Sequence, residues 1–266
     1  EESFAQYDIQ VAQILLDAGD LASRHRYMNA AHAMETLHQH QVLPIVNEND
    51  TVSIDELKFG DNDWLAALVA CLLPADLLVV LTTVDGLVEN FGKKNPRTIP
   101  LVETIDADIK KLAGGTLSAT AVGGMEAKLR AAKMTARTGI PMVIASGKKK
   151  RVLANIIDGR DEGTFFTPRP GRLKGRKRRI AFFHHPKGSL WVDNGARDAL
   201  RDKGKSLLPP GVAKCNGDFA NGDVVRLCDI NGTEFARAIS RFDADEIRGR
   251  KLKGIEIVHR NDLVIL

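Results

Sequence analysis

The sequence predicts an α/β domain, with a mainly parallel sheet sandwiched by helices, followed by a small C-terminal β-barrel domain. Two observations predict this division. Helical and strand patterns alternate over the first 150 residues, and such alternation favours parallel strands joined by right-handed crossovers. From residue 180 onward, short apolar runs are separated by turn signals, which is typical of a small all-β domain.

The α/β region is expected to contain four helices and three buried strands. Apolar residues recur at helical spacing in the expected helices, which are 5–18, 24–40, 63–72 and 128–138. The expected strands are short continuous apolar runs at 42–46, 77–81 and 141–145, and such runs indicate strands buried on both faces. Ligands of open parallel sheets bind beyond the carboxyl ends of the strands, so the polar residues that follow these runs are candidates for a site.

The C-terminal region is expected to begin after a basic linker. Residues 167–179 are rich in Gly and Pro, with six basic residues between Arg172 and Arg179. Expected strands follow at 179–183, 189–193, 223–229, 234–240, 256–260 and 263–266, with one helix at about 193–203. Asn221-Gly222 and Asn231-Gly232 are turn signals between apolar runs. The boundaries predicted from these patterns are 1–165 for the α/β domain, 166–179 for the linker and 180–266 for the β domain.

Composition excludes several classes of protein. The chain is 44% hydrophobic and 27% charged, as expected of a soluble globular protein. Its net charge of +4 is too weak to demand a nucleic-acid partner. No apolar run approaches the roughly 20 residues that a membrane helix needs. The three cysteines are far apart and form no CxxC pair, which argues against a zinc site and a disulfide framework and favours a reducing cytoplasm. No set of protein metal ligands is expected.

Two polar clusters lie close together in the first domain. Asn47-Glu48-Asn49-Asp50 follows an expected strand, and Gly60-Asp61-Asn62-Asp63 precedes an expected helix. Carboxylates hold ammonium groups, whereas amides and backbone N–H groups hold carboxylates, so the clusters suit a zwitterionic ligand. Turns and helix caps also favour Asn, Asp and Gly, and a single cluster would be explained by that alone. The pair within 20 residues favours a binding site.

A third cluster, Gly123-Gly124-Met125-Glu126-Ala127-Lys128, is expected to lead into a helix. Adjacent glycines allow close backbone approach, and the N–H groups at the start of a helix attract phosphate. A lysine one turn into that helix suits phosphoryl transfer, which depends on positioning and charge neutralisation. The segment is not a Walker A motif, and taken alone it is better explained as a Gly-Gly turn before a helix with a solvated lysine.

Four segments resemble a known family. LPIVNENDTVSIDELKFGDNDWLAALVA (43–70) resembles the substrate-loop region of the glutamate 5-kinases, a group within the amino-acid kinase family. VLTTVDGL (80–87) is similar to their nucleotide-contacting strand end, and AVGGMEAKLRAA (121–132) to their phosphate segment. SLLPPGV (206–212) and the segments after it resemble the PUA domain of many bacterial members. The resemblance covers nearly the whole chain in the family's order, and implies an amino-acid-kinase-like domain followed by a PUA-like domain.

The resemblance implies ATP-dependent phosphorylation, with Mg²⁺, of the γ-carboxylate of L-glutamate to L-glutamyl 5-phosphate. That reaction is the first step of proline biosynthesis. It also implies proline as a feedback inhibitor and a homo-oligomer, either a dimer or a tetramer.

The resemblance also implies roles for individual residues. Lys128 would stabilise the transferring phosphoryl group and Asp63 would orient the catalytic lysines. Residues implied to bind glutamate are Asp50, Asn62, Asn47 and Asp61. Residues implied to bind ATP are Thr82, Thr83, Val122, Gly123, Gly124, Met125, Glu126, Ala127 and Lys128.

The sequence departs from the family's pattern in three places. Thr83 stands where Asp is usual and Val122 where Thr is common, and both substitutions affect expected nucleotide contacts. The family's first strand and glycine loop, with a first catalytic lysine, and a second glycine turn do not occur in this chain. The expectation is therefore a kinase domain that is incomplete at its N-terminal side and has little or no activity in this form.

Two alternatives remain open from the sequence. One is another amino-acid-kinase-family enzyme with a different acceptor, such as acetylglutamate, aspartate, uridylate or carbamate. The other is an RNA-binding PUA protein with a degenerate kinase domain, in which the basic stretch at 172–179 attracts phosphates. Aromatic residues that suit base stacking in that case are Trp191, Phe182, Phe183, Phe219 and Phe242. Small barrels need aromatic core fillers, which favours a structural role for them.

Overall fold

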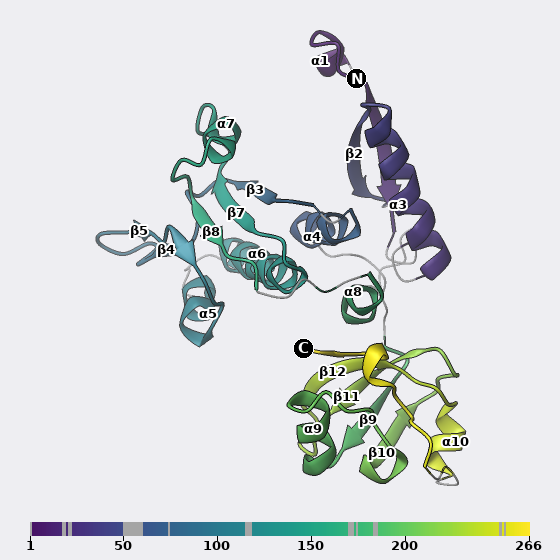
Figure 1. Cartoon of the computed structure of the whole chain (residues 1–266). Coiled ribbons are helices and arrows are strands. Elements are labelled where there is room, and N and C mark those ends of the chain that lie inside the picture. Colours follow the sequence, from purple (N-terminus) through teal and green to yellow (C-terminus); the bar gives the residue numbers. More distant parts are fainter. Residues whose placement is uncertain are drawn as a thin grey trace. The chain divides into compact units, whose positions relative to one another are not determined.

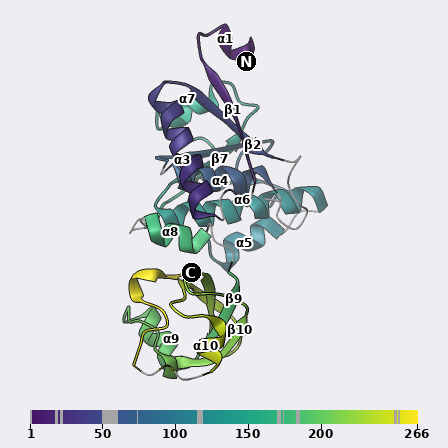
Figure 2. The ribbon, with the colours of Figure 1, turned by 90° about the vertical axis from the view of Figure 1, so that its right-hand side faces the viewer.

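The computed structural model describes residues 2–17, 20, 23–49, 61–73, 75–114, 119–169, 173, 175–182, 186–249, 252 and 254–266. The chain forms two compact units, residues 1–173 and 174–266 (Figures 1 and 2). Each unit has its own sheets and helices, and each is described by itself below. No helix among the described residues is long and apolar enough to span a membrane.

The first unit begins with a two-stranded parallel sheet. Its elements are α1 (Glu2–Ala5), β1 (Val11–Leu16), α3 (Arg24–Gln39) and β2 (Leu43–Glu48). The register pairs Val11 with Leu43, and α3 packs on β2 as the crossover between the strands. The predictions of a helix at 24–40 and a strand at 42–46 are confirmed. The helix predicted at 5–18 is wrong, because its apolar run pairs with β2; a short apolar run fits either periodicity until its partner is known.

A four-stranded sheet forms the rest of this unit. Its strands, in the order β3-β7-β8-β6, are β3 (Leu78–Thr82), β7 (Met142–Ser146), β8 (Thr164–Phe166) and β6 (Leu101–Val102). β3 pairs with β7 and β6 with β8 in parallel, whereas β7 and β8 are antiparallel. A short antiparallel hairpin joins β4 (Val88–Glu89) to β5 (Arg97–Thr98). The predicted strands at 77–81 and 141–145 are thus confirmed, and the sheet is mainly parallel as expected.

Helices cover both faces of this sheet. They are α4 (Asn62–Leu72), α5 (Ala107–Gly114), α6 (Ala119–Thr138) and α7 (Val152–Ile157). The Thr135 hydroxyl of α6 lies 3.9 Å from the Met142 sulfur, whereas Val152 of α7 packs on Val143. Successive strand residues point to opposite faces, so α6 and α7 lie on opposite sides of β7.

Helix α6 begins earlier than the sequence predicted. It runs from Ala119, so Gly123 and Gly124 lie inside the helix and Lys128 lies well past its first turn. The expectation of a diglycine turn before the helix is therefore wrong. Flanking alanines favour helix, and the packing of α6 on α4, α5 and β7 offsets the roughly 1 kcal/mol that each interior glycine costs.

The second unit is a small five-stranded β domain. Its strand order is β10-β9-β11-β12-β13, with β9 (Gly188–Val192), β10 (Val212–Gly217), β11 (Val224–Cys228), β12 (Glu234–Ile239) and β13 (Leu263–Ile265). Helices α9 (Asn194–Arg201) and α10 (Ala244–Arg248) complete it. Its core contains Leu190, Val225, Leu227 and Ala236, all fully buried. Strand β10 had not been predicted. Gly222 and Gly232 adopt φ of 94° and 87°, as their predicted turns require.

Part of the predicted linker is helical. α8 (Gly175–Phe182) packs on β12 and β13, and it buries Ile180 and Ala181. Arg237 donates a 2.8 Å hydrogen bond to the carbonyl of Ala181, and Arg176 forms a 2.8 Å ion pair with Asp262. The strand predicted at 179–183 is therefore wrong. Ile180 and Ala181 lie in a helix that packs on the sheet, and they do not form hydrogen bonds with it as an additional strand.

The aromatic residues of the second unit lie in different environments. Phe219 is buried in the core and Phe242 packs against it. Trp191 lies on the sheet with the Lys214 ammonium 4.9 Å from its ring centroid. Phe183 lies outside the described residues. No disulfide joins Cys71, Cys215 and Cys228, which all lie within the described residues.

Candidate active site

The start of α4 is organised by Asp61. This residue is the N-cap, with φ of −158° and ψ of 151°, and its Oδ1 accepts a 2.7 Å hydrogen bond from the backbone N–H of Trp64. Such a cap satisfies one of the free N–H groups at a helix start and is worth about 1 kcal/mol. The cap places Asn62 and Asp63 in the first turn, where backbone N–H groups and the helix dipole favour negative charge.

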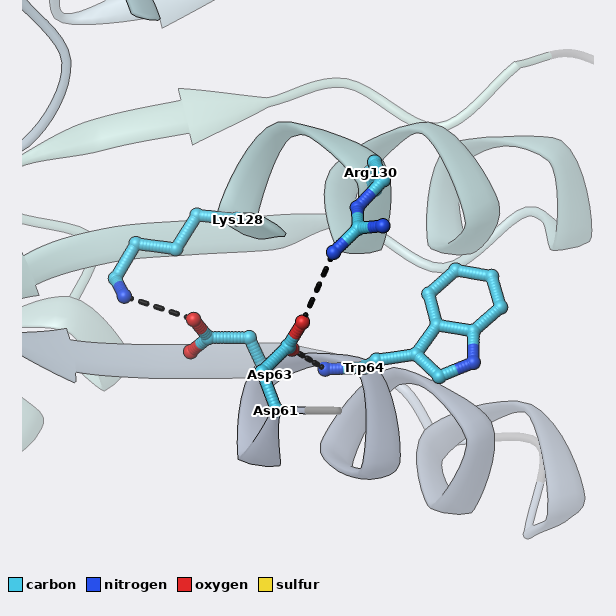
Figure 3. A network of polar contacts seen from close by, with 5 residues as sticks. All are labelled: Asp61, Asp63, Trp64, Lys128 and Arg130. Atoms are coloured by element: carbon cyan, nitrogen blue, oxygen red, sulfur yellow. Dashed lines mark hydrogen bonds and ion pairs between the residues drawn. The ribbon is translucent and has the colours of Figure 1, made fainter. Parts of the chain in front are cut away.

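Two ion pairs connect this turn to α6 (Figure 3). The Lys128 ammonium lies 2.8 Å from Asp63 Oδ2, with side chains that are 13% and 20% exposed. The Arg130 guanidinium lies 3.0 Å from Asp61 Oδ2, with side chains that are 63% and 23% exposed. Lys128 is therefore held in a sheltered position, whereas Arg130 forms its pair at the surface.

The two helices run in the same direction. Residues at their far ends also meet, because Cys71 Sγ lies 3.2 Å from Thr138 Oγ1. Between these contacts, Leu65 and Leu68 of α4 and Ala131 of α6 are buried. Close packing of the two helices therefore fixes the position of Lys128 along α6 relative to the start of α4.

Lys128 also lines a pocket beside β3. The cavity has a volume of about 170 Å³ and is lined by Thr82, Thr83, Val84, Gly86, Leu87, Val88, Phe91, Leu112, Ala113, Gly124, Met125 and Lys128. Five of these residues were expected to bind nucleotide from the sequence: Thr82, Thr83, Gly124, Met125 and Lys128. They come from the end of β3 and from α6, which are distant in the sequence.

The loop after β3 supplies lining residues that the sequence did not single out: Gly86 and Leu87 lie within the segment 80–87 that resembles a nucleotide-contacting strand end, whereas Val88 and Phe91 lie beyond it. Gly86 adopts φ of +136°, and a Cβ there would lie 2.5 Å from Thr164 Oγ1. That hydroxyl accepts a 2.8 Å hydrogen bond from the N–H of Leu87 and donates a 2.6 Å bond to the carbonyl of Ile99. The Asp-Gly-Leu run at 85–87 was the available signal, since a required glycine marks close backbone approach. No local signal marks Leu112 or Ala113, which arrive from α5.

The lining of the pocket contains two kinds of chemical group. Leu87, Val88, Phe91, Leu112 and Met125 are apolar and suit a flat aromatic base. Thr82, Thr83 and Lys128 supply hydroxyls and an ammonium, which suit phosphate oxygens. The volume fits part of a nucleotide rather than a whole drug-sized ligand. Residues present in the pocket therefore fit a nucleotide whose base enters the cavity.

Other predicted site residues lie around this core. Asn47 lies near the end of β2, where it pairs with Leu15 of β1, and β2 packs against α4. Glu126 is exposed and Ala127 is buried, and neither is among the lining residues of the pocket. Of Val122 and Gly123 only the helical backbone is described, and Asp50 lies outside the described residues. Within the part of the chain that the structure describes, no cluster of three or more His, Cys, Asp and Glu residues suits a metal ion.

Comparison with known proteins identifies the family. Residues 1–146 match the model of the amino acid kinase family, and residues 188–260 match that of the PUA domain. A glutamate 5-kinase of Geobacter sulfurreducens is 44% identical over 100% of this chain and 75% of its own length. The chain belongs to the glutamate 5-kinase family. A glutamate 5-kinase of Pelobacter propionicus is 42% identical with the same coverage.

A comparison with solved structures found weaker likenesses. Carbamate kinase from Giardia lamblia bound to AMP-PNP is 21% identical, with a TM-score of 0.46, over 63% of this chain and 66% of its own. Membership of the glutamate 5-kinase family makes the first unit a kinase domain and its expected cofactor ATP. The C-terminal unit contains the PUA domain that the sequence predicted.

Proposed function

We propose that this chain phosphorylates the γ-carboxylate of L-glutamate with ATP, forming L-glutamyl 5-phosphate in the first step of proline biosynthesis. The observation that supports this most directly is the position of Lys128. Its side chain lines the pocket beside β3, and its ammonium is bonded to Asp63 in the first turn of α4. A cation therefore stands between a cavity suited to a nucleotide and a helix start suited to an anionic substrate.

The nucleotide half of the site consists of the loop after β3 and one face of α6. Leu87, Phe91 and Met125 would hold the base, and Thr82 and Thr83 would donate hydrogen bonds to phosphate oxygens. ATP supplies the phosphoryl group, and Mg²⁺ bound to its phosphates reduces their charge. Magnesium commonly keeps phosphate and water ligands, which is compatible with few protein carboxylates at the site.

Lys128 and Asp63 would act together. An ammonium group has three N–H donors, and the bond to Asp63 uses one of them. The remaining donors can neutralise charge on the oxygens of a transferring phosphoryl group. Asp63 holds the ammonium in place, so little reorganisation is needed when that charge develops. We therefore propose Lys128 as a catalytic residue and Asp63 as the residue that orients it.

The amino-acid half is proposed from the polar residues around the start of α4. Asn47, Asp50, Asp61 and Asn62 would bind glutamate, with carboxylates for its ammonium group and amides or helix N–H groups for its carboxylates. Packing of β2 against α4 supports this grouping for Asn47 and Asn62.

Further parts of the proposal concern the whole protein. We propose domain boundaries of 1–165 and 180–266 with a connecting segment at 166–179, although residues 175–179 already belong to α8. Proline as feedback inhibitor, a homo-oligomeric assembly and a cytoplasmic location complete the proposal.

An acceptor panel tests the reaction. ATP-dependent acyl phosphate is trapped with hydroxylamine while ADP release is followed, using L-glutamate, N-acetylglutamate, L-aspartate, uridylate and carbamate as acceptors. Calorimetric titration with L-glutamate and with a non-hydrolysable ATP analogue measures binding independently of turnover. The expected result is binding of both ligands and turnover with a preference for glutamate, whereas binding without turnover would support the sequence-based expectation of little or no activity in this form. Tighter binding or faster turnover of another acceptor would overturn the assignment.

A further inference from the structure

Asp61 uses both of its carboxylate oxygens in structural contacts. Oδ1 accepts the capping bond from the N–H of Trp64 at 2.7 Å, and Oδ2 pairs with Nη2 of Arg130 at 3.0 Å (Figure 3). The N-cap residue of α4 is thus bonded to α6. The Asp61 carboxylate is therefore shared: one oxygen caps the first turn of α4, and the other binds Arg130 of α6.

Arg130 and Lys128 hold the start of α4 from two directions. Residues two apart on a helix do not share a face, so Lys128 and Arg130 leave α6 at different angles. Lys128 reaches Asp63 inside the site, and Arg130 reaches Asp61 at its outer edge. Two contacts at different angles resist rotation of the first turn of α4 against α6, which one contact would allow.

We propose that Arg130 is a positioning residue for the amino-acid half of the site: it holds Asp61, and through it the first turn of α4, in register with Lys128. This inference rests on the proposed function. Arg130 is 63% exposed and is not among the described residues that line the nucleotide pocket. An exposed pair of this kind contributes little to global stability, so its effect falls on the alignment of the groups around Asn62.

The proposal predicts a selective loss of glutamate affinity. In the full chain, Arg130→Met should raise the dissociation constant for L-glutamate about fivefold, since that is the range of one exposed ion pair. Affinity for a non-hydrolysable ATP analogue should stay within about twofold, within the scatter of surface substitutions. Arg130→Lys should recover most of the loss, because it retains a cation at the same position. Lys133→Met is the matched control, since it removes a cation from the same helix beside a different depression.

A double-mutant cycle on L-glutamate affinity tests the contact itself. Asp61→Asn keeps an oxygen that can accept from the N–H of Trp64 but removes the charge that Arg130 binds. If the pair exists in solution, combining Asp61→Asn with Arg130→Met raises the dissociation constant for L-glutamate by less than the product of the two single effects. Single effects that simply multiply would overturn the contact on which the proposal depends.

The outcomes separate this inference from the proposed function. A wild-type chain that binds no L-glutamate overturns the proposed function. A wild-type chain that binds glutamate, with unchanged affinity in Arg130→Met, overturns the positioning role alone. An equal loss in Lys133→Met, or an equal loss of nucleotide affinity, also overturns it, because the effect would then reflect net charge or general destabilisation.

Discussion

Lys128 and Lys149 are both ion-paired lysines of the first unit, and they differ in their surroundings. Lys128 is 13% exposed, pairs with Asp63 and lines the pocket beside β3. Lys149 is 43% exposed and lies between Asp85 and Glu162, at 3.4 and 3.2 Å. Glu162 is held in turn by a 2.8 Å hydrogen bond from Asn155.

The comparison teaches that the number of carboxylates around a lysine indicates its role. A lysine between two carboxylates is structural, whereas one with a single carboxylate partner can also bind a ligand. Two carboxylates already neutralise Lys149, and their contacts raise the pKa of its ammonium, chiefly through the hydrogen bond to Glu162. Lys149 therefore acts as a tie between the loop after β3 and the segment before β8. Both lysines line a cavity, but Lys128 pairs with one carboxylate rather than two in the described part of the chain, so more of its N–H donors remain available to a ligand.

The largest expected effect separates the two lysines by activity. Lys128→Met should reduce the turnover number about 100-fold or more, the usual result of removing a group that stabilises transition-state charge. Its unfolding free energy should fall by about 1 to 3 kcal/mol, because the sheltered Asp63 carboxylate loses its partner and its place at a helix start offsets only part of that loss. Lys149→Met is the matched control and should keep turnover within about twofold. Steady-state kinetics and thermal melting check both, and equal losses in the two variants would remove the distinction.

The next effect concerns the loop that Lys149 holds. Gly86→Ala should lower the unfolding free energy by about 2 kcal/mol and weaken ATP binding, because the new Cβ would overlap the Thr164 hydroxyl in a strained φ region. Gly92→Ala is a control with φ of +73° and open space around the position. The Gly92→Ala variant measures the free-energy cost of placing alanine at a positive φ without a steric clash. Equal destabilisation of the two variants in denaturant titration would contradict the close-packing argument.

A smaller effect distinguishes the apolar lining residues of the pocket from the polar ones. Phe91→Ala should raise the KM for ATP about fivefold, the equivalent of roughly 1 kcal/mol of lost apolar contact, and leave the KM for the acceptor unchanged. Lys128→Met, in contrast, should act mainly on turnover. Kinetics with each substrate varied in turn measure the two KM values and the turnover number. A matching rise in both KM values would refute the assignment of the apolar lining residues to the base.

The smallest effect is a pH dependence of the Lys149 tie. Hydrogen bonds from Asn155 and then Lys149 lower the pKa of Glu162 below its ordinary 4.5, and that contribution to stability is lost as pH falls through the lowered value. The pKa of Lys149 is raised above 10.5, so its contribution is lost only as pH rises through the raised value. The melting-temperature difference between wild type and Lys149→Met should be constant from about pH 5 to 10 and shrink outside that range. A difference that peaks near pH 7 would contradict this.

Prediction from sequence succeeded where one element carries its own signal. The strands at 78–82 and 142–146 are continuous apolar runs, and the helix at 24–39 has clear periodicity. Prediction failed where a partner decides. Residues 11–16 become a strand by pairing with β2, and Ile180 enters a helix that packs on β12 and β13.

The candidate site shows the same division. The sequence by itself determined which chemical groups are present: the amides and carboxylates at 47–50 and 60–63, the two glycines at 123–124 and the lysine at 128. Only the tertiary structure decided that Lys128 meets Asp63, that Arg130 meets Asp61, and that Leu112 closes the pocket from α5. Local patterns reflect interactions between neighbours in the chain, whereas these contacts join residues up to 69 positions apart and form when apolar faces of helices and sheet are buried together.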